Sequence, residues 1–294
     1  MGHIINCEQL AQDIYSRLSN EIAILKQQGH QPSFATILVG NNAPSLIYVK
    51  KKFAIAETLG IQSSLYHYEH SSTAELIEII TKLNNNPAIH GIFVQLPLPS
   101  NINSVEIINH INPKKDVDGL TSTNLGNLIL EKNQGIILDV NKAVVPCTPL
   151  GCMYILGSII KDFSKKKAVV LGRSTLVGIP MWNLLLNNDC TVSLAHSLTE
   201  NVPQICKEAD ILVVAIGKPK FINKNYIKKG AIVLDVGISR LLENGKTKIV
   251  GDVDLDSVID YVSYITKVPK GVGLLTVATL MSNIVKACML NTSS

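Results

Sequence analysis

Two short segments carry side chains whose types and spacing could do chemistry, and the first segment ends in an amide. In GIFVQLPLP, residues 91–99, an apolar run is followed by Gln95 and then by Pro97 and Pro99. Proline has no backbone N–H and fixes φ, so a strand has to end near Gln95. Because α/β proteins bind ligands beyond the carboxyl ends of their strands, we expect the Gln95 side chain to lie in a ligand site.

The second segment, KDVDGL at residues 115–120, brings two carboxylates into a loop. Asp116 and Asp118 are two residues apart, between Pro113 and Gly119. Proline and glycine indicate a turn, and acids at this spacing can serve only to stabilise it. The alternative is that a carboxylate here accepts hydrogen bonds from a ligand. The loop by itself leaves both interpretations open.

A helix predicted at residues 44–59, ended by Gly60, would bring a lysine to such a site. Ser45, Tyr48 and Lys52 share one helix face, because they follow one another at intervals of three and four residues. A solvated basic face would explain the same lysine. On a pocket wall, loss of water lowers the pKa of a lysine toward the range in which it can take up and release a proton. Gln95 could hold that lysine by a hydrogen bond without neutralising it.

Residues 172–178, GRSTLVG, lie between an apolar run and a predicted helix, as a dinucleotide-binding turn does. Such a turn needs small residues where the backbone approaches a pyrophosphate at a helix N-terminus. Ser174 and Val177 replace the second and third glycines of the G-x-G-x-x-G pattern. On its own, the loop therefore fits an ordinary strand–helix turn as well as a nucleotide site.

The residues after the next predicted strand, Ala195-His196-Ser197, bear on which dinucleotide would bind. No Asp or Glu stands where an acceptor for a ribose 2′-hydroxyl is expected. Together with Arg173, this absence favours a 2′-phosphate, and so NADP over NAD, although Leu198 argues the other way. His196 can equally be a histidine that is satisfied at a strand end. Gly217-Lys218-Pro219 and Asp235-Val236-Gly237-Ile238 follow further strands, and each is either an ordinary turn or part of the same site.

Five motifs, in chain order, resemble those of the bifunctional methylenetetrahydrofolate dehydrogenase/cyclohydrolase family. They are Ser45-x-x-Tyr48-x-x-x-Lys52, VQLPLP, KDVDGL, PCTP at residues 146–149, and GRSTLVGIP at residues 172–180, which matches the family pattern G-R-S-x-x-V-G-x-P. The resemblance spans nearly the whole chain. It implies an enzyme that oxidises methylenetetrahydrofolate with NADP and hydrolyses the methenyl product to 10-formyltetrahydrofolate, a one-carbon conversion that serves purine biosynthesis.

The resemblance also implies roles for individual residues. Lys52 is the expected general acid/base of the hydrolysis, in which water loses a proton and a ring nitrogen gains one. Gln95 would orient Lys52, Tyr48 would position the folate, and Asp118 would accept hydrogen bonds from pteridine N–H groups, while Asp116 fits a loop-stabilising role better. Further substrate contacts are expected from Ser45, Leu96, Pro97 and Gly271, and cofactor contacts from Gly172, Arg173, Ser174, Val177, Gly178, His196, Ser197, Gly217, Lys218 and Ile238.

The segment before the last predicted helix departs from the family. Relatives usually read PGGVGPMT where residues 269–276 of this chain read PKGVGLLT. Lys270 replaces a glycine, so its backbone angle is in question, and Leu274 replaces a proline that would pre-set the first helical turn. In the family this loop borders the nicotinamide and the folate, so the changes bear on hydride transfer more than on Lys52.

Three alternatives to the bifunctional enzyme stay open. The first is a cyclohydrolase whose dehydrogenase is impaired by the changes at residues 269–276. The second is another two-domain NAD(P) dehydrogenase, which would not require Lys52 together with Gln95 and Asp118. The third is a folate- or nucleotide-binding protein without catalysis, against which the presence of those three residues argues.

The elements that must position these residues alternate between strands and helices. After a first helix at about residues 8–28, strand-like runs at 34–39, 61–68 and 91–95 are separated by helical stretches. A second alternation follows Pro149, with strands at 168–172, 191–195, 211–216 and 231–236. Such βαβ alternation predicts parallel sheets with helical crossovers.

We therefore predict a two-domain α/β protein with a cleft between the domains. Residues 1–143 are expected to form an N-terminal folate-binding catalytic domain. Residues 144–270 are expected to form a Rossmann-type, doubly wound parallel-sheet domain that binds NAD(P). The final helix, within residues 271–294, is expected to pack back on the first domain, as the resemblance suggests.

The composition fits a cytoplasmic globular enzyme that acts on anionic small molecules. The chain has 294 residues, a net charge of +4 and an isoelectric point of about 8.6. No basic stripe with interleaved aromatic residues indicates a nucleic-acid partner, whereas mild basicity suits dinucleotide phosphates or a polyglutamylated folate.

Cysteine and histidine usage gives no sign of a disulfide framework or a metal. The six cysteines form no CxxC pair and follow no secretory signal, which predicts reduced thiols in the cytoplasm. His67 and His70 are three residues apart without a second ligand cluster, so no metal is expected. We also expect no membrane-spanning segment, because no apolar run reaches the required length, and the family implies a homodimer.

Overall fold

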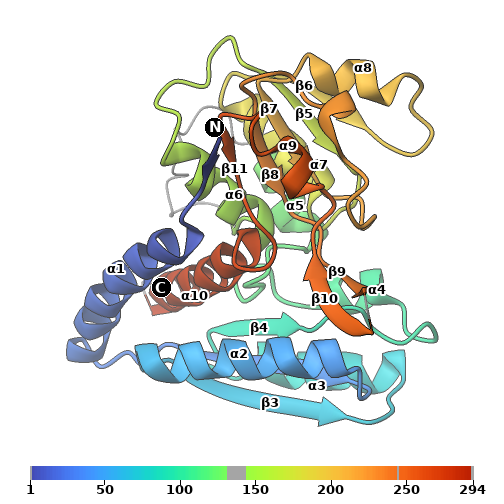
Figure 1. The fold of residues 1–294 in the computed structure, drawn as a ribbon. Helices are drawn as coiled ribbons and strands as arrows, with labels where there is room; N and C mark the ends of the chain where they lie inside the picture. Colours follow the sequence, from blue (N-terminus) through green and yellow to red (C-terminus); the bar gives the residue numbers. More distant parts are fainter. Residues whose placement is uncertain (1, 131–143, 244, 293–294) are drawn as a thin grey trace. The chain divides into compact units, whose positions relative to one another are not determined.

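The computed structural model describes residues 2–130, 144–243 and 245–292, which form two compact units (Figure 1). The large-sheet unit contains residues 2–12, 128–130 and 146–276. The small-sheet unit contains residues 13–127, 144–145 and 277–292. Both are α/β, as predicted.

The small-sheet unit is built on three parallel strands in the order β3-β2-β4. These strands are β2 (Ser33–Val39), β3 (Gln62–Tyr68) and β4 (Gly91–Val94), and the crossover helices are α2 (Ala43–Leu59) and α3 (Thr73–Asn84). Leu76 and Ile80 of α3 share a hydrophobic core with Ile37 of β2 and Ile92 of β4. Helices α1 (Cys7–Gln27), α4 (Ser104–Asn109) and α5 (Ser122–Leu130) add to the fold. Because the strands are parallel, the segments that follow them emerge at one edge of the sheet.

The ends of the crossover helices follow from local sequence. Asn42 caps the N-terminus of α2, and its side chain accepts a hydrogen bond from the backbone N–H of Ser45 at 3.1 Å. Gly60 ends the same helix with φ of +71°, an angle that glycine adopts without strain. Helix α3 begins with a capping box in which Ser72 and Glu75 exchange hydrogen bonds. These signals fix where helices α2 and α3 begin and where α2, which carries Lys52, ends.

The large-sheet unit contains six parallel strands in the order β1-β11-β8-β7-β5-β6. The strands are β1 (His3–Ile4), β5 (Lys167–Leu171), β6 (Thr191–Ala195), β7 (Ile211–Val214), β8 (Ile232–Asp235) and β11 (Tyr264–Ile265). Among the described residues, the helices that belong wholly to this unit are α6 (Cys147–Gly157), α7 (Gly178–Asn187), α8 (Val202–Lys207) and α9 (Leu255–Val258), with a 3-10 turn η1 at Lys224–Tyr226. The chain order reverses at β5, which pairs with β6 on one side and β7 on the other. Doubly wound sheets bind ligands at such a switch point.

Strand β11 was not predicted, and neither were two further features of the large-sheet unit. The N-terminal strand β1 pairs with β11 at the edge of the large sheet, although residues 1–143 were assigned to the other domain. An antiparallel hairpin, β9 (Ser239–Glu243) and β10 (Lys246–Val250), follows the last predicted strand. Two-residue strands and short polar strands give weak periodic signals, which explains these omissions. The predicted boundary at residues 143–144 adjoins residues 131–143, which lie outside the described part of the chain, so it stays a prediction.

The last helix, α10 (Val272–Thr292), corrects the statement that no apolar run is long enough to span a membrane. Residues 272–291 have a mean hydropathy of 1.6, which meets the length and composition of a membrane span. Of that window, 78% is buried inside the protein. A helix that is apolar on all sides and buried is also what a protein core contains, and we interpret α10 as a core helix.

Candidate functional sites

Lys52 and Gln95 meet in the small-sheet unit through a direct hydrogen bond. The Nζ atom of Lys52 donates to Oε1 of Gln95 at 3.1 Å, and the two residues are only 7% and 9% exposed. The Gln95 backbone N–H donates to the carbonyl of Ile37, which holds residue 95 at the end of β4. Its Nε2 donates to the Leu96 carbonyl at 2.6 Å. Because that bond uses the donor end of the amide, the acceptor oxygen faces the lysine.

Phe93 contacts the same amine and was not singled out from the sequence. The Nζ atom of Lys52 lies 3.7 Å from the centroid of the Phe93 ring, which is buried. Phe93 precedes Gln95 by two residues, so both side chains lie on one face of β4. The negative face of an aromatic ring stabilises an ammonium group. The spacing of two from Gln95 is the signal by which Phe93 could have been found.

A second buried lysine in this unit, Lys115, has a different role. Its Nζ donates to the carbonyls of Leu83 and Asn86, at 3.2 and 2.7 Å, where helix α3 ends. Burial lowers the pKa of Lys115 from its ordinary value. The ammonium binds two backbone carbonyls at and just after the C-terminus of the helix, which is a structural task. Lys52 instead contacts the neutral amide of Gln95 and the ring of Phe93.

Asp116 stabilises its own loop, as the sequence indicated. The residue is 1% exposed, and its Oδ1 accepts from the backbone N–H of Gly119 at 2.9 Å. Its Oδ2 accepts from the backbone N–H of Thr121 at 2.8 Å and from Nδ2 of Asn124 at 2.9 Å. With both oxygens occupied by the protein, Asp116 shapes the turn.

Asp118 follows a short contact between its loop and β4. Ile92 of β4 forms an isolated parallel bridge with Asp116, and its N–H donates to the carbonyl of Lys115 at 2.6 Å. The chain then turns at residues 117–118, so Asp118 lies in the turn that follows the bridge. Asp118 is half-buried. Its role as the acceptor for pteridine N–H groups stays a prediction.

The remaining predicted folate residues lie at the N-terminus of α2, after β4 and before α10. The hydroxyl of Ser45 donates to the capping oxygen of Asn42 at 3.3 Å, which fits a supporting role for Ser45. Tyr48 is half-buried and lies one turn before Lys52. Leu96 is half-buried, Pro97 is exposed, and Gly271 is buried. Their substrate contacts stay predictions.

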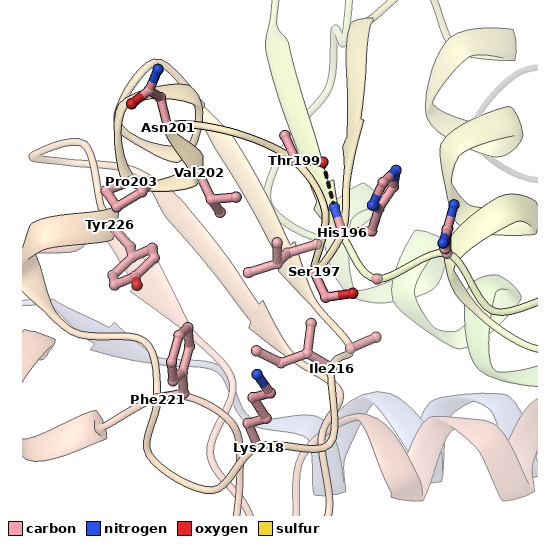
Figure 2. Close-up of a pocket in the computed structure, with 14 residues that line it drawn as sticks. His196, Ser197, Thr199, Asn201, Val202, Pro203, Ile216, Lys218, Phe221 and Tyr226 are labelled. Carbon is pink, nitrogen blue, oxygen red and sulfur yellow. Dashed lines mark hydrogen bonds between the residues drawn. The ribbon is translucent and has the colours of Figure 1, made fainter.

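The large-sheet unit has a cavity of about 520 Å³ beside the ends of β5, β6 and β7 (Figure 2). The predicted cofactor residues Gly172, Arg173, His196, Ser197 and Lys218 line it. Figure 2 shows the rings of Phe221 and Tyr226 along one wall and Ser197 and His196 on another. Ile238 is not among the residues that line this cavity. The cavity therefore brings together half of the predicted cofactor residues.

The turn after β5 is closed by contacts that only glycine permits. Gly172 has a φ of +120°, and a Cβ atom there would lie 2.2 Å from the carbonyl oxygen of Ala215. A Cβ on Gly178 would lie 2.1 Å from the carbonyl oxygen of Gly172. The hydroxyl of Ser174 accepts from the N–H groups of Val177 and Gly178, at 3.2 and 3.4 Å. Glycine is thus retained where the turn packs tightly, and Ser174 takes a capping role at the start of α7.

His196 is partly satisfied by its own loop. Its Nδ1 accepts from the N–H of Leu198 at 3.2 Å, and its backbone N–H donates to the hydroxyl of Thr199 at 3.0 Å, the bond drawn in Figure 2. Because Nδ1 acts as an acceptor, the ring proton of a neutral His196 belongs on Nε2. The histidine is thus a strand-end residue with internal bonds that also lines the cavity. The internal hydrogen bonds fit the interpretation as a strand-end histidine, and a cofactor contact of His196 stays a prediction.

Lys270 adopts a backbone angle that glycine takes without strain. Its φ is +73°, the left-handed region. Its Nζ lies 2.9 Å from Oε1 of Glu8, and this bond, together with the positive charge, lowers the pKa of the exposed Glu8 carboxyl. At the next residue, a Cβ on Gly271 would lie 2.1 Å from the carbonyl oxygen of Lys267. The loop thus tolerates lysine at 270 but requires glycine at 271.

Two family models match the chain. The model of the tetrahydrofolate dehydrogenase/cyclohydrolase catalytic domain matches residues 5–118. The model of the NAD(P)-binding domain of the same name matches residues 146–292. Among curated relatives, the bifunctional protein FolD of Listeria innocua is 44% identical over 98% of this chain and 97% of its own length. The FolD protein of Anoxybacillus flavithermus is 45% identical over 97% of each chain.

Solved structures are similar over the same length. The FolD dehydrogenase/cyclohydrolase of Campylobacter jejuni is 40% identical, with a TM-score of 0.91 over 98% of this chain and 99% of that chain. The enzyme of Trypanosoma brucei, solved with NADP and an inhibitor, is 33% identical, with a TM-score of 0.92 over 100% of this chain and 99% of that chain. The similarity covers both units and both candidate sites.

Proposed function

This chain belongs to the tetrahydrofolate dehydrogenase/cyclohydrolase family, and we propose that proton transfer takes place in its small-sheet unit and cofactor binding in its large-sheet unit. The enzyme oxidises methylenetetrahydrofolate to methenyltetrahydrofolate with NADP and hydrolyses the methenyl cation to 10-formyltetrahydrofolate. The observation that carries the assignment of residues is the buried hydrogen bond of 3.1 Å between Lys52 and Gln95.

Lys52 is the acid/base of the hydrolysis. As the oxygen of water bonds to the methenyl carbon, the neutral amine of Lys52 takes a proton from that water. The resulting ammonium gives the proton to one ring nitrogen as the bond from that nitrogen to the carbon breaks. The remaining hydroxyl proton leaves to solvent as the formyl carbonyl forms on the other nitrogen. One residue can serve in both directions when its protonation is balanced near the working pH.

Gln95 and Phe93 hold Lys52 through this cycle in complementary ways. The amide oxygen of Gln95 accepts an N–H whether the lysine is neutral or charged, so the amine stays in place while its charge changes. The amide carries no charge and does not fix the lysine as an ammonium. The ring of Phe93 stabilises the charged form, which balances the burial that disfavours it.

The cavity of the large-sheet unit fits a dinucleotide. Gly172 and Gly178 leave no room for a Cβ where the turn meets the start of α7, as a pyrophosphate-binding turn requires. Arg173 would pair with a 2′-phosphate, and His196 and Ser197 would contact the ribose side of the ligand. NADP, when bound, supplies the acceptor for the hydride of the one-carbon bridge. The protein needs no base for hydride loss, only alignment of donor and acceptor.

The backbone angle at Lys270 argues against the alternative of a cyclohydrolase without dehydrogenase activity. A φ of +73° lies in the region that glycine favours, so the lysine occupies a conformation that is open to a glycine at this position. The left-handed angle costs a non-glycine residue about 1–2 kcal/mol, which the loop absorbs. Hydride transfer therefore remains part of the proposed function.

We further propose a cytoplasmic homodimer that acts in one-carbon metabolism, supplies purine biosynthesis and accepts a polyglutamylated folate as substrate. Support comes from the resemblance of the whole chain to bifunctional relatives. Residues 1–143 and 144–270 serve as the folate and nucleotide domains in this proposal, with residues 271–294 returning to the first. Sedimentation velocity tests the dimer, and a single monomeric species would contradict it.

The function is tested with purified protein, methylenetetrahydrofolate and NADP, with NAD in a parallel assay. Formation of the reduced nicotinamide and formation of the methenyl intermediate are followed separately. We expect reduction of NADP without accumulation of the methenyl intermediate, since both steps run. If neither cofactor is reduced but supplied methenyltetrahydrofolate is hydrolysed rapidly, the sequence changes at residues 269–276 have abolished the dehydrogenase activity. Neither activity would contradict the proposed function.

A further inference from the structure

Two buried carboxylates of the large-sheet unit have no role in the function described so far. Asp235 is the last residue of β8, and Asp252 follows the hairpin β9–β10; they are 3% and 0% exposed. A buried carboxylate is costly unless its oxygens accept hydrogen bonds. The bonds that these two accept lead directly to the wall of the nucleotide cavity.

Asp252 organises the turn that follows β7. Its Oδ2 accepts from the backbone N–H of Ile216 at 2.7 Å and from that of Gly217 at 2.9 Å. Ile216 and the next residue but one, Lys218, line the cavity, and Gly217 between them has a φ of +67°. The carboxylate thus determines the path of the backbone that carries two cavity residues.

The rest of this loop runs along the segment that contains Asp252. The N–H of Lys220 donates to the carbonyl of Gly251, and the N–H of Ile222 donates to the carbonyl of Asp252, both at 2.9 Å. Phe221, which lies between them, forms part of the cavity wall together with Tyr226 (Figure 2). The loop from Ile216 to Ile222 is therefore held by residues thirty or more positions away in the chain.

Asp235 in turn holds the backbone of Asp252. Its Oδ1 accepts from the N–H of Asp252 at 2.9 Å, and its Oδ2 accepts from the N–H of Val253 at 3.0 Å. Each carboxylate lies against a glycine of the other segment. A Cβ on Gly251 would meet Oδ2 of Asp235, and a Cβ on Gly237 would lie 2.1 Å from Cγ of Asp252. Burial, with a contribution from the charge of Asp252, raises the pKa of Asp235 to about 7.

We infer that Asp252 is a positioning residue for the NADP site, acting through the backbone of Ile216 and Gly217. Removal of its carboxylate would leave two partly buried N–H groups without an acceptor, and the turn would rearrange to find one. The rearrangement would displace Lys218 and Phe221 from the cavity wall. The inference rests on the proposed function in that the cavity is taken to bind NADP.

The side chain of Asp252 allows a discriminating pair of variants. Both N–H groups bind Oδ2, whereas Oδ1 has no hydrogen-bond partner within the described residues. Asparagine can therefore keep its single oxygen at the Oδ2 position and place its NH₂ at the Oδ1 position. Asp252→Ala removes the acceptor altogether. Asp256→Ala, an exposed acid at the start of α9, is the matched control.

The experiment measures the Kd of NADP by titration, the KM for NADP and kcat of the dehydrogenase, and the hydrolysis of supplied methenyltetrahydrofolate. For Asp252→Ala we expect the Kd and KM for NADP to rise on the order of tenfold, the equivalent of losing one to two buried hydrogen bonds. Asp252→Asn should stay within about threefold of wild type, because the acceptor is retained. The cyclohydrolase rate of both variants should be unchanged, since Lys52 and Gln95 belong to the other unit.

Three results would overturn the inference. They are an unchanged Kd in Asp252→Ala, an equal loss of binding in Asp252→Asn, which would show that the negative charge rather than the acceptor is required, and a parallel loss of cyclohydrolase activity, which would show a general structural role. No NADP binding by the wild-type protein is a separate result. It would contradict the proposed function, and the inference with it.

Discussion

The two candidate sites differ in the groups that form them: side chains form the first, and backbone turns form much of the second. In the small-sheet unit, one titratable amine is held by an amide oxygen and an aromatic ring, and all three side chains are buried. In the large-sheet unit, the turn after β5 is shaped by glycines, and the turn after β7 by a carboxylate that binds backbone N–H groups.

The difference follows from the two tasks. Proton transfer requires a group that changes charge, and that group must be a side chain whose surroundings tolerate both states. Binding a dinucleotide phosphate requires close approach of the backbone, which side chains obstruct. A single side-chain substitution should therefore remove the first activity, whereas the second should be sensitive to added atoms and to misplaced turns.

The strongest test of this contrast is Lys52→Met. Loss of the acid/base should lower the cyclohydrolase rate by about 10²–10⁴-fold, whereas hydride transfer needs no base and should persist. The methenyl intermediate should then accumulate while NADP is reduced. Lys51→Met, an exposed neighbour on α2, is the control. Hydrolysis by Lys52→Met at the wild-type rate would remove the lysine from the mechanism.

Gly178→Ala tests the nucleotide site by adding one carbon atom to the turn after β5. Its Cβ would lie 2.1 Å from the carbonyl oxygen of Gly172, so α7 or the turn must shift. We expect kcat/KM for NADP to fall by about 10–100-fold, since overpacking costs roughly 1–3 kcal/mol. Cyclohydrolase activity on supplied substrate should persist. Gly126→Ala, where a Cβ meets nothing within 4 Å, should change neither activity.

Gln95→Glu asks whether the neutrality of the amide matters. A carboxylate beside Lys52 would favour the ammonium form, so the neutral base would become available only at higher pH. The ascending limb of the cyclohydrolase pH–rate profile should move upward, and the rate on that limb should fall about tenfold for a shift of one pH unit. An unmoved profile would mean that Gln95 does not influence the protonation of Lys52.

Phe93→Leu should move the ascending limb of the cyclohydrolase pH–rate profile to lower pH, by less than Gln95→Glu moves it to higher pH. Without the ring, the ammonium loses about 0.5–2 kcal/mol of stabilisation, so the neutral amine is favoured and the limb moves to lower pH. Rates on the limb should rise a few-fold, while the dehydrogenase is unaffected. Phe93→Tyr keeps the ring and serves as the control. A limb that stays in place in Phe93→Leu would assign Phe93 to packing alone.

The smallest effect on hydrolysis is expected from Asp235→Asn. This variant should instead change how the stability of the folded protein depends on pH. The raised pKa of Asp235, about 7, means that the folded protein binds a proton more tightly than the unfolded chain. The stabilisation from this bound proton is fully present below the pKa of an aspartate in the unfolded chain, which is near 4. It is lost as the pH rises toward 7, by at most about 1.4 kcal/mol of unfolding free energy per pH unit.

Asp235→Asn removes the titration, so the pH dependence of the free energy of unfolding should flatten between pH 4 and 7. Chemical denaturation at several pH values measures it. Stability at pH 5 should also fall, because one acceptor of the bonds to Asp252 and Val253 is lost. A slope equal to that of the wild type would show that Asp235 does not carry the proton.

Local sequence signals determined the elements and the order of the site residues. The period-two and period-3.6 patterns, the cap at Asn42, the glycine after α2 and the prolines after Gln95 act over a few residues, so they can be recognised without tertiary structure. They placed β2, β3, β4 and the core of the Rossmann-type sheet, and they brought Lys52 and Gln95 to one strand end. They left the roles of Asp116 and Asp118 open, and only the family resemblance suggested different roles for the two residues.

Only the tertiary structure decided what lies against those residues. Phe93 is one apolar residue among several in its strand until the ring is seen 3.7 Å from the amine of Lys52. Asp252 is one acid of a polar segment until its oxygen is found on the backbone of Ile216 and Gly217. The pairing of β1 with β11 joins residues about 260 positions apart. Contacts of such separation depend on how the whole chain packs, and no local pattern encodes them.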